Sequence, residues 1–387
     1  MLTFYEMKKV LSKRVTQIAI LIAIGLAFVF SLFAIGSFQY EDTDNHLIKG
    51  ISAPRMLVET KNQWRGELSP DRIVELIQAK QNGDWQSTSD ILFALNEMLV
   101  GEAKDNESYD YEAILTADSE SLQSFYDYYK ENLKKEVEEV GKTPEQRRFL
   151  MKEYKKIRSP FYYEAADAWD TMLLYATTFS LVLIMIISLI TAGIFSDEFR
   201  YHTSAILFST KYGRSKVIKS KIYAGLAITT FVYVIGMGLL SFICFSVMGI
   251  SGILTAYQFY QPYSIYSLTF GELYGVILIC GYIASLLSAS LSMFVAAKTR
   301  MTSIAIVAPF ILFFVSPFIG RVLPFKSFFS LTPDQLTNIM NSVRIPYIYQ
   351  IGSVVFKQIP FLVLFYTLLS IAILPFLYYS FRQTKVE

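Results

Sequence analysis

The sequence predicts an all-α polytopic membrane protein, with six transmembrane helices and a mostly helical extracellular domain between the first and the second. Two observations predict this class. Several stretches of about 18–25 residues contain no charged side chain, and a helix needs about 20 residues to cross a bilayer. The segment 39–170, by contrast, is as charged as an ordinary water-soluble domain. This distribution decides the class, because the overall 53% hydrophobic content is close to that of soluble domains.

The uncharged stretches place the membrane spans. We expect them at residues 15–38, 171–195, 222–247, 273–296, 303–319 and 361–379. The first stretch is longer than the core of a signal peptide, about 7–15 residues, so we expect an uncleaved helix. Before it, residues 1–14 place Phe4, Met7, Val10 and Leu11 on one helical face. This pattern predicts a cytoplasmic amphipathic helix that lies in the membrane interface.

Basic residues predict the orientation, because loops rich in Lys and Arg stay in the cytoplasm. Fourteen Lys and Arg residues lie beside the spans on one side, and four lie in the shorter loops of the other side. We therefore expect both termini, the loop 196–221 and the tail 380–387 in the cytoplasm. The segments 39–170 and 320–360 would lie outside, and the second would carry a short helix after Thr332-Pro333-Asp334.

The segment 39–170 is expected to form an acidic helical domain. It holds 27 Asp and Glu residues against 17 Lys and Arg. Ser69 before Pro70 predicts a helix start leading into residues 72–80, and Thr143-Pro144-Glu145-Gln146 predicts a capping box that opens a helix to about residue 158. Residues 118–140 have helical spacing without Gly or Pro, and no strong strand alternation occurs in the segment.

Acidic side chains are the candidate ligand-binding groups on the outer side. They cluster between Glu97 and Glu120, and they are either a solvated surface or an electrostatic collector for a cationic peptide or antibiotic. Glu272, at the outer mouth of the fourth span, is either an interfacial anchor or a gate residue. The candidate substrate or gate residues are Glu272, Glu102, Asp105, Glu107 and Asp110.

Enzymatic chemistry finds little support in the sequence. Two histidines and two cysteines lie far apart, so we expect no metal site, no directly bound cofactor and no catalytic residue. Gly141-Lys142-Thr143 resembles the end of a P-loop, but Glu136 stands where the upstream glycine is required. Basic residues are divided among short loops beside the membrane, which argues against nucleic acid as a partner.

The loop between the second and third spans is the most informative motif. An acidic residue, Glu198, closes the membrane helix, and Thr203 follows five residues later. Three apolar residues, a polar turn with a basic residue and a final lysine at the next span, Lys221, complete the pattern. A short helix held by two membrane spans could insert apolar side chains into a groove of a soluble partner, with charge pairs at the rim. Alternatively, the loop only anchors at the lipid surface through its positive charge.

This loop resembles the coupling segment of permease subunits of ABC-2 type ATP-binding-cassette exporters. The family pattern runs from an acidic residue through Gly-Thr and a hydrophobic helical turn to Arg and then Lys. This chain departs from it at His202, where the family usually has glycine, and at Lys211-Tyr212-Gly213, where a proline often precedes the arginine. The resemblance assigns ATPase coupling to Glu198, Arg200, Thr203, Ile206, Leu207, Phe208 and Arg214.

The resemblance implies a membrane-spanning subunit of a bacterial exporter with a large first extracellular loop, placed in the cytoplasmic membrane. ATP and Mg would bind a separate cytosolic ATPase dimer, and a second permease copy or a homologue would complete the assembly in the bilayer. The cargo would be an amphipathic peptide, a bacteriocin-like toxin or a lipophilic antibiotic. Two alternatives stay open: a mechanotransmitting ABC membrane subunit, which usually has four spans, and a non-transport sensor whose extracellular domain binds a ligand.

Overall fold

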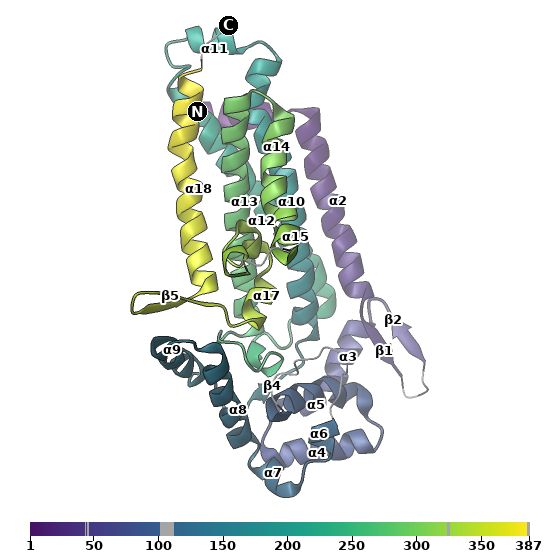
Figure 1. Cartoon of the computed structure of the whole chain (residues 1–387). Coiled ribbons are helices and arrows are strands. Elements are labelled where there is room, and N and C mark those ends of the chain that lie inside the picture. The colour runs from purple at the N-terminus through teal and green to yellow at the C-terminus, as the bar shows by residue number, and fades with distance from the viewer. Residues whose placement is uncertain (43, 45, 101–111, 323–325, 385–387) are drawn as a thin grey trace.

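Among the residues that the structure describes, six helices are long and apolar enough to cross a membrane. The computed structural model describes residues 1–42, 44, 46–100, 112–322 and 326–384. The apolar helices are α2 (Arg14–Gly36), α10 (Asp167–Arg200), α12 (Lys216–Met248), α13 (Phe270–Thr299), the segment Thr302–Gly320 and α18 (Gln358–Arg382). Each overlaps one of the six predicted spans, and together they form an elongated bundle (Figure 1). The prediction of a helical polytopic membrane protein is confirmed at this level.

The bundle is centred on α10 and α13. Two-thirds of the most apolar stretch of each is buried, compared with 17% for Thr302–Gly320. Small side chains allow the two helices to approach closely, and the hydroxyl oxygens of Ser188 and Ser288 lie 2.5 Å apart. At Gly281 an added Cβ would lie 2.1 Å from the Ser180 hydroxyl oxygen, so this position has no room for a side chain.

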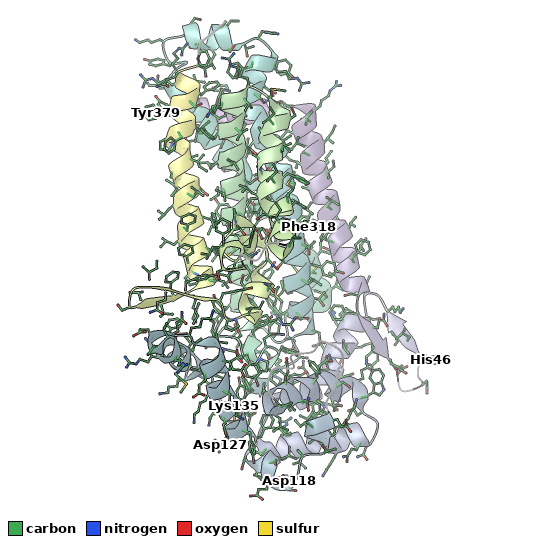
Figure 2. All side chains as sticks on the ribbon, in the orientation of Figure 1. His46, Asp118, Asp127, Lys135, Phe318 and Tyr379 are labelled. Atoms are coloured by element: carbon green, nitrogen blue, oxygen red, sulfur yellow. The ribbon has the colours of Figure 1, made fainter. Side chains whose placement is uncertain are left out.

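The fifth span is not a single regular helix. It consists of α14 (Thr302–Phe310), a π-helical turn (Ile311–Val315) and α15 (Ser316–Val322). Pro309 lies inside α14 and removes a backbone donor just before the π turn, which accounts for the irregularity. Exposed apolar residues cover the outside of the bundle, as Phe318 and Tyr379 show in Figure 2.

Short helices at one end of the bundle form a separate layer built largely from residues 53–154. They are α3 (Ala53–Lys61), α4 (Pro70–Gln81), α5 (Trp85–Val100), α6 (Glu112–Leu115), α7 (Ser119–Gln123), α8 (Phe125–Val140) and α9 (Pro144–Tyr154). The predicted caps form: Ser69 accepts from the backbone N–H of Arg72, and Thr143 accepts from that of Gln146. We call this end of the bundle the domain end (Figure 1).

Several details differ from the sequence-based expectations. Ser124 separates α7 from α8, so residues 118–140 form two helices. Helix α9 ends at Tyr154 rather than near residue 158, and two turn bonds follow it, from the Lys156 N–H to the Glu153 carbonyl and from the Ile157 N–H to the Tyr154 carbonyl. The Gln146 side chain accepts from the backbone N–H of Lys142 instead of closing the predicted capping box on Thr143.

Within the described residues, three short antiparallel strand pairs are present where no strand was expected. They pair β1 (Gln39–Glu41) with β2 (Leu47–Lys49), β3 (Gly66–Glu67) with β4 (Tyr162–Tyr163), and β5 (Ile348–Ile351) with β6 (Val354–Lys357). Strands of two to four residues are too short to leave an alternating pattern in the sequence.

The segment 320–360 also holds more than one short helix. It contains α16 (Lys326–Phe329), a 3₁₀ turn (Pro333–Thr337) and α17 (Ile339–Arg344), in addition to the β5–β6 hairpin. Asn338 interrupts the helix that was expected after Thr332.

Both chain ends lie at the end of the bundle opposite the short-helix layer (Figure 1). Helix α1 (Leu2–Leu11) and helix α11 (Ser204–Ser209) are found there, beside the loops rich in Lys and Arg. We call this the basic end. Val10 of α1 is buried, whereas Phe4 and Tyr5 of the same helix are exposed.

Candidate functional site at the basic end

Helix α10 ends in a tight turn that places Glu198 under α11. The backbone N–H of Thr203 donates to the Glu198 carbonyl, and that of His202 donates to the Phe199 carbonyl. This pair of bonds is a Schellman C-cap, whose central residue takes a left-handed conformation. His202 does so with φ of 55°, which explains why glycine suits this position.

A buried cluster of charges lies directly beneath this turn. Lys221 of α12, only 1% exposed, donates to Glu198 at 2.7 Å and to Glu6 at 3.0 Å. Lys9 donates to the same Glu198 oxygen at 2.6 Å, and the Thr203 hydroxyl donates to the other at 2.6 Å. Glu198 therefore joins α1, α10 and α12 at one point.

A second ion pair extends the cluster toward α2. Lys13, which precedes that helix, donates to Asp197 at 2.5 Å and to the Gly193 carbonyl at 3.4 Å. We use the name basic-end cluster for Glu6, Lys9, Lys13, Asp197, Glu198 and Lys221. Its three acids balance its three lysines. Burial lowers the pKa of Lys9, but the carboxylates of Glu198, Glu6 and Asp197 outweigh that effect and raise it.

Helix α11 begins directly after Thr203, whose hydroxyl bonds to Glu198, and it has one face outward. Ile206 is 69% exposed, Leu207 is partly buried, and Phe208 is buried against Phe381 of α18 with ring centroids 5.1 Å apart. Of the three apolar side chains among the predicted coupling residues, the structure thus presents Ile206 most fully to the surface. Phe208 instead fixes α11 to the bundle.

The turn after α11 is held to the end of α18. Arg214 lies over the Phe208 ring at 4.4 Å, and it donates to the carbonyls of Arg382 at 2.6 Å and Thr384 at 3.1 Å. At Gly213 an added Cβ would lie 1.8 Å from the Leu207 carbonyl oxygen. Only glycine permits this close approach. The structure thus explains why glycine occupies position 213, which the sequence pattern did not reveal.

The remaining predicted site residues lie apart from this cluster. Arg200, the last residue of α10, lies over the exposed ring of Tyr201 at 5.6 Å. Glu272, at the domain end, closes a complete capping box with Thr269 at the start of α13. Glu102, Asp105, Glu107 and Asp110 lie outside the described residues.

A second buried ion cluster, missed from the sequence, lies at the domain end. The Lys61 side chain is 5% exposed and is bonded to Asp90 of α5 and Asp167, the first residue of α10. Burial lowers the pKa of Lys61, but the opposite effect of Asp167 and Asp90 is larger, so the net shift of this pKa is upward. A cavity of about 780 Å³ adjoins the three residues and is also lined by Asp170 and Tyr260. We call Lys61, Asp90, Asp167 and Asp170 the domain-end cluster.

No local signal could have identified these ion partners. Lys221 lies 215 residues from Glu6, and Lys61 lies 106 residues from Asp167. The part of the chain that the structure describes contains no group of three or more His, Cys, Asp and Glu side chains that could hold a metal ion. Contacts at the basic end connect the α11 segment to four other helices: the Thr203 hydroxyl bonds to Glu198 of α10, which meets α1 and α12, and Phe208 and Arg214 contact α18.

Comparisons with known proteins found no match to this chain. No family model, curated protein or solved structure matches the sequence.

Proposed function

We propose that this chain is the membrane-spanning permease subunit of an ATP-driven exporter that resembles the ABC-2 type. The observation that carries the proposal is the position of α11, a short helix held between the two long helices α10 and α12 at the basic end, with Ile206 facing outward. A soluble ATPase could grip this face. The chain would then receive work from ATP hydrolysis without binding ATP itself.

The buried contacts supply a path for that work. Phe208 and Arg214 connect α11 to α18, and Glu198 connects it to α1 and α12. Packed interiors transmit displacements because they deform little. A push on Ile206 would therefore move several membrane helices together rather than bend one loop.

In this proposal the basic end faces the cytoplasm and residues 39–170 lie outside a bacterial cell. Two permease subunits, identical or homologous, would assemble in the bilayer with two ATPase subunits. The cargo class is an amphipathic peptide, a bacteriocin-like toxin or a lipophilic antibiotic. The negative excess of the domain-end cluster, three aspartates against Lys61, suits a cargo that carries positive charge.

Helix α10 also favours a second candidate, a mechanotransmitting ABC subunit. It runs without interruption over 34 residues, which is about 50 Å, and has an ion cluster at each end. A movement of Glu198 could thus reach Asp167, and through Lys61 the short-helix layer, without any cargo crossing the membrane. Transport and mechanotransmission share the ATPase and differ only in what moves.

Affinity purification from native membranes in mild detergent tests the shared step. We expect mass spectrometry to identify a soluble ATP-binding-cassette ATPase with the wild-type chain. Ile206→Asp should abolish its recovery, because the change places a charge in the contact without disturbing the buried core. Met301→Asp is the matched control, since Met301 is also exposed and apolar but lies in the other loop of the basic end.

The outcomes separate the candidates. Recovery of an ATPase with the wild type and Met301→Asp, but not with Ile206→Asp, supports the coupling role of α11. Equal recovery with both variants would exclude Ile206 from the contact. If no ATPase is found under conditions where known complexes survive, the exporter and the mechanotransmitter both fail, and a non-transport sensor becomes the working hypothesis.

A further inference from the structure

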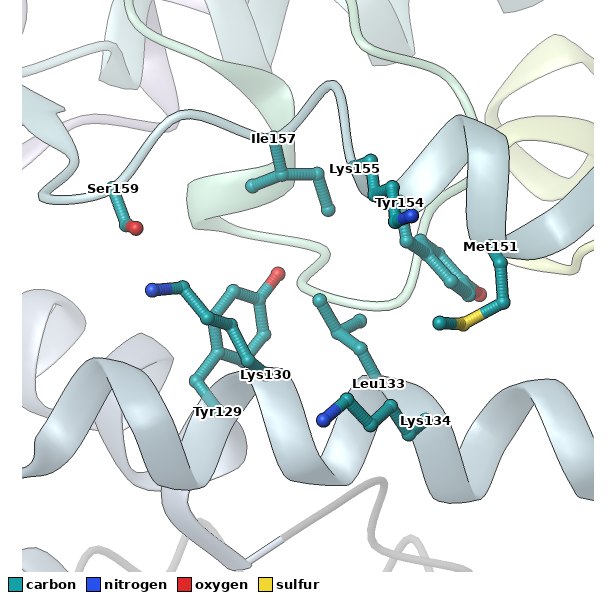
Figure 3. Close-up of a pocket in the computed structure, with 9 residues that line it drawn as sticks. All are labelled: Tyr129, Lys130, Leu133, Lys134, Met151, Tyr154, Lys155, Ile157 and Ser159. Carbon is teal, nitrogen blue, oxygen red and sulfur yellow. The ribbon is translucent and has the colours of Figure 1, made fainter.

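A cavity of about 280 Å³ lies between α8, α9 and the loop that follows α9 (Figure 3). Its walls are mainly apolar, from Leu133, Met151 and Ile157 and from the rings of Tyr129 and Tyr154. Both tyrosine hydroxyls are already used: Tyr129 donates to the Pro262 carbonyl at 2.7 Å and Tyr154 to the Tyr263 carbonyl at 2.8 Å. The two rings therefore offer the cavity apolar surface and no free hydroxyl.

Three lysines, Lys130, Lys134 and Lys155, surround this apolar space (Figure 3). All three are exposed, and Lys130 has only a loose pair with Asp127 at 3.5 Å. Within the described ranges, neither Lys134 nor Lys155 forms an ion pair. An apolar cavity with cations at its mouth has the chemistry that recognises an apolar chain ending in an anion.

The charge of the surrounding segment supports an anionic ligand. Residues 130–158 contain ten Lys and Arg against six Asp and Glu, whereas residues 39–129 contain seven against 18. Basic charge is thus concentrated around the cavity in a layer that is otherwise acidic. At physiological ionic strength charges are felt over roughly 8 Å, so the three lysines that line the cavity contribute positive potential at its mouth.

The cavity also lies close to the bundle. Glu153 of α9 pairs with Lys357 of the β5–β6 hairpin at 2.6 Å, immediately before α18 begins. Figure 1 shows α9 beside this hairpin at the ends of the membrane helices. The end of an apolar helix such as α18 is expected at the membrane surface, where amphiphiles collect. The cavity therefore lies near the place where such molecules are most concentrated.

We propose that this cavity binds a single-chain anionic amphiphile of the fatty-acid type. Its hydrocarbon chain occupies the space between Leu133, Met151 and Ile157, and its carboxylate meets the lysines. The volume lies just below the range for ligand sites, about 300–1,000 Å³, which suits one chain and not two. This site is independent of the proposed transport function.

Photolabelling of the full chain in nanodiscs of zwitterionic phospholipid tests the proposal. The probe is dodecanoate with a diazirine near the end of its chain, and mass spectrometry locates the labelled peptides. We expect labels on the peptides that contain Leu133, Met151 or Ile157. Unlabelled dodecanoate should compete, whereas dodecyltrimethylammonium should not. Each CH₂ added from hexanoate upward should improve competition about threefold to fourfold until the cavity is full.

Charge-reversal variants distinguish binding that depends on the lysines from nonspecific hydrophobic binding of the probe. Lys134→Glu combined with Lys155→Glu should reduce labelling about tenfold, and the corresponding pair of Arg substitutions should retain it. Lys142→Glu is the matched control, because Lys142 is exposed in the same α8–α9 unit but does not line the cavity. Unchanged labelling in the double Glu variant would overturn the proposal.

Two further results would also overturn it. Equal competition by dodecyltrimethylammonium would make the cavity a general apolar site. Equally strong competition by phosphatidylglycerol added to the nanodisc would identify a two-chain lipid as the occupant. Ile157→Gln provides a check within the cavity, since it should weaken labelling while leaving the lysines in place.

Discussion

The two ion clusters at the ends of α10 differ in balance and in burial. The basic-end cluster has three acids and three lysines, and its central pair, Lys221 and Glu198, is almost fully buried. The domain-end cluster has three aspartates for Lys61, and the Asp90 side chain is 54% exposed beside a cavity. The first arrangement can lock helices together, whereas the second leaves unneutralised charge facing a space that a ligand could enter.

This difference predicts how much each cluster contributes to stability. Removing one member of a buried pair leaves the other charge uncompensated, which costs about 3–5 kcal/mol. Where a partner is half exposed, water solvates the remaining charge and the cost falls. The basic end should therefore be the more fragile of the two toward single substitutions.

The largest effect is expected from Lys221→Met. It removes the buried cation that Glu198 and Glu6 share and leaves Glu198 only the half-exposed Lys9, so we expect a loss of about 3 kcal/mol in the free energy of unfolding, the low end for a broken buried pair. Denaturant unfolding in mild detergent micelles measures the loss. Lys219→Met, an exposed position in the same helix, should change stability by less than about 0.5 kcal/mol. Similar stabilities for the two variants would contradict the locking role of the cluster.

A smaller loss, about 2 kcal/mol, is expected from Lys61→Met, because Asp90 stays partly solvated. The comparison variant is Lys49→Met, at an exposed position of β2. The pKa of Lys61 is raised in the folded state, so its stabilisation is complete below the unfolded lysine pKa of about 10.4. It is lost only as the pH rises through the higher folded value. If the stability difference between wild type and Lys61→Met disappeared as the pH was raised from 7 to 9, this account would be contradicted.

A contact of intermediate burial, between α9 and the β5–β6 hairpin, sharpens the comparison through its pH dependence. Burial raises the pKa of Glu153, but the opposite effect of Lys156 and Lys357 is larger. The net shift of this pKa is therefore downward. Its stabilisation, about 1 kcal/mol, is therefore present above the unfolded glutamate pKa and lost as the pH falls through the folded value. Hydrogen exchange of β5 and β6, corrected for intrinsic rates, should show faster opening at pH 3 than at pH 6. Glu153→Gln should remove most of that pH dependence, and an unchanged dependence would exclude Glu153 as its source.

The smallest effect concerns the turn that holds the basic-end cluster in place. His202→Gly should stabilise the protein by about 1 kcal/mol, because the left-handed conformation costs about 1–2 kcal/mol for a residue with a side chain. Tyr201→Gly is the control at an ordinary φ of −98°, where glycine should destabilise by about 0.5–1 kcal/mol. The same unfolding assay compares them. Destabilisation by His202→Gly would mean that the imidazole makes a contact of its own.

Much of the local structure could be predicted from particular residues. Ser69 with Pro70 and Thr143 with Pro144 mark the starts of α4 and α9, since these caps depend on atoms three residues away. The prediction for residues 118–140 missed the break at Ser124, because no glycine or proline marks it. The short strand pairs were missed for a related reason, since two to four residues carry too little pattern.

The candidate site was predicted only in part. The sequence drew attention to Glu198 and to the apolar residues of α11, but it could not tell that Phe208 turns inward while Ile206 stays exposed. Six consecutive helical residues face every direction, and their inner face is decided by where α18 lies. The role of Gly213 likewise depends on the distance to the Leu207 carbonyl, which no pattern of residue types encodes.

By itself, the sequence determined the six apolar helices, the charge difference between the two ends of the bundle and the caps of several short helices. These properties depend on runs of residues and on neighbours within a turn or two. Only the tertiary structure decided that Glu198 meets Lys9 and Lys221, that Lys61 meets Asp167, and that lysines surround an apolar cavity. The ion partners are separated by 23 to 189 residues in the chain and become neighbours through packing, so their pairing is a property of the assembled bundle.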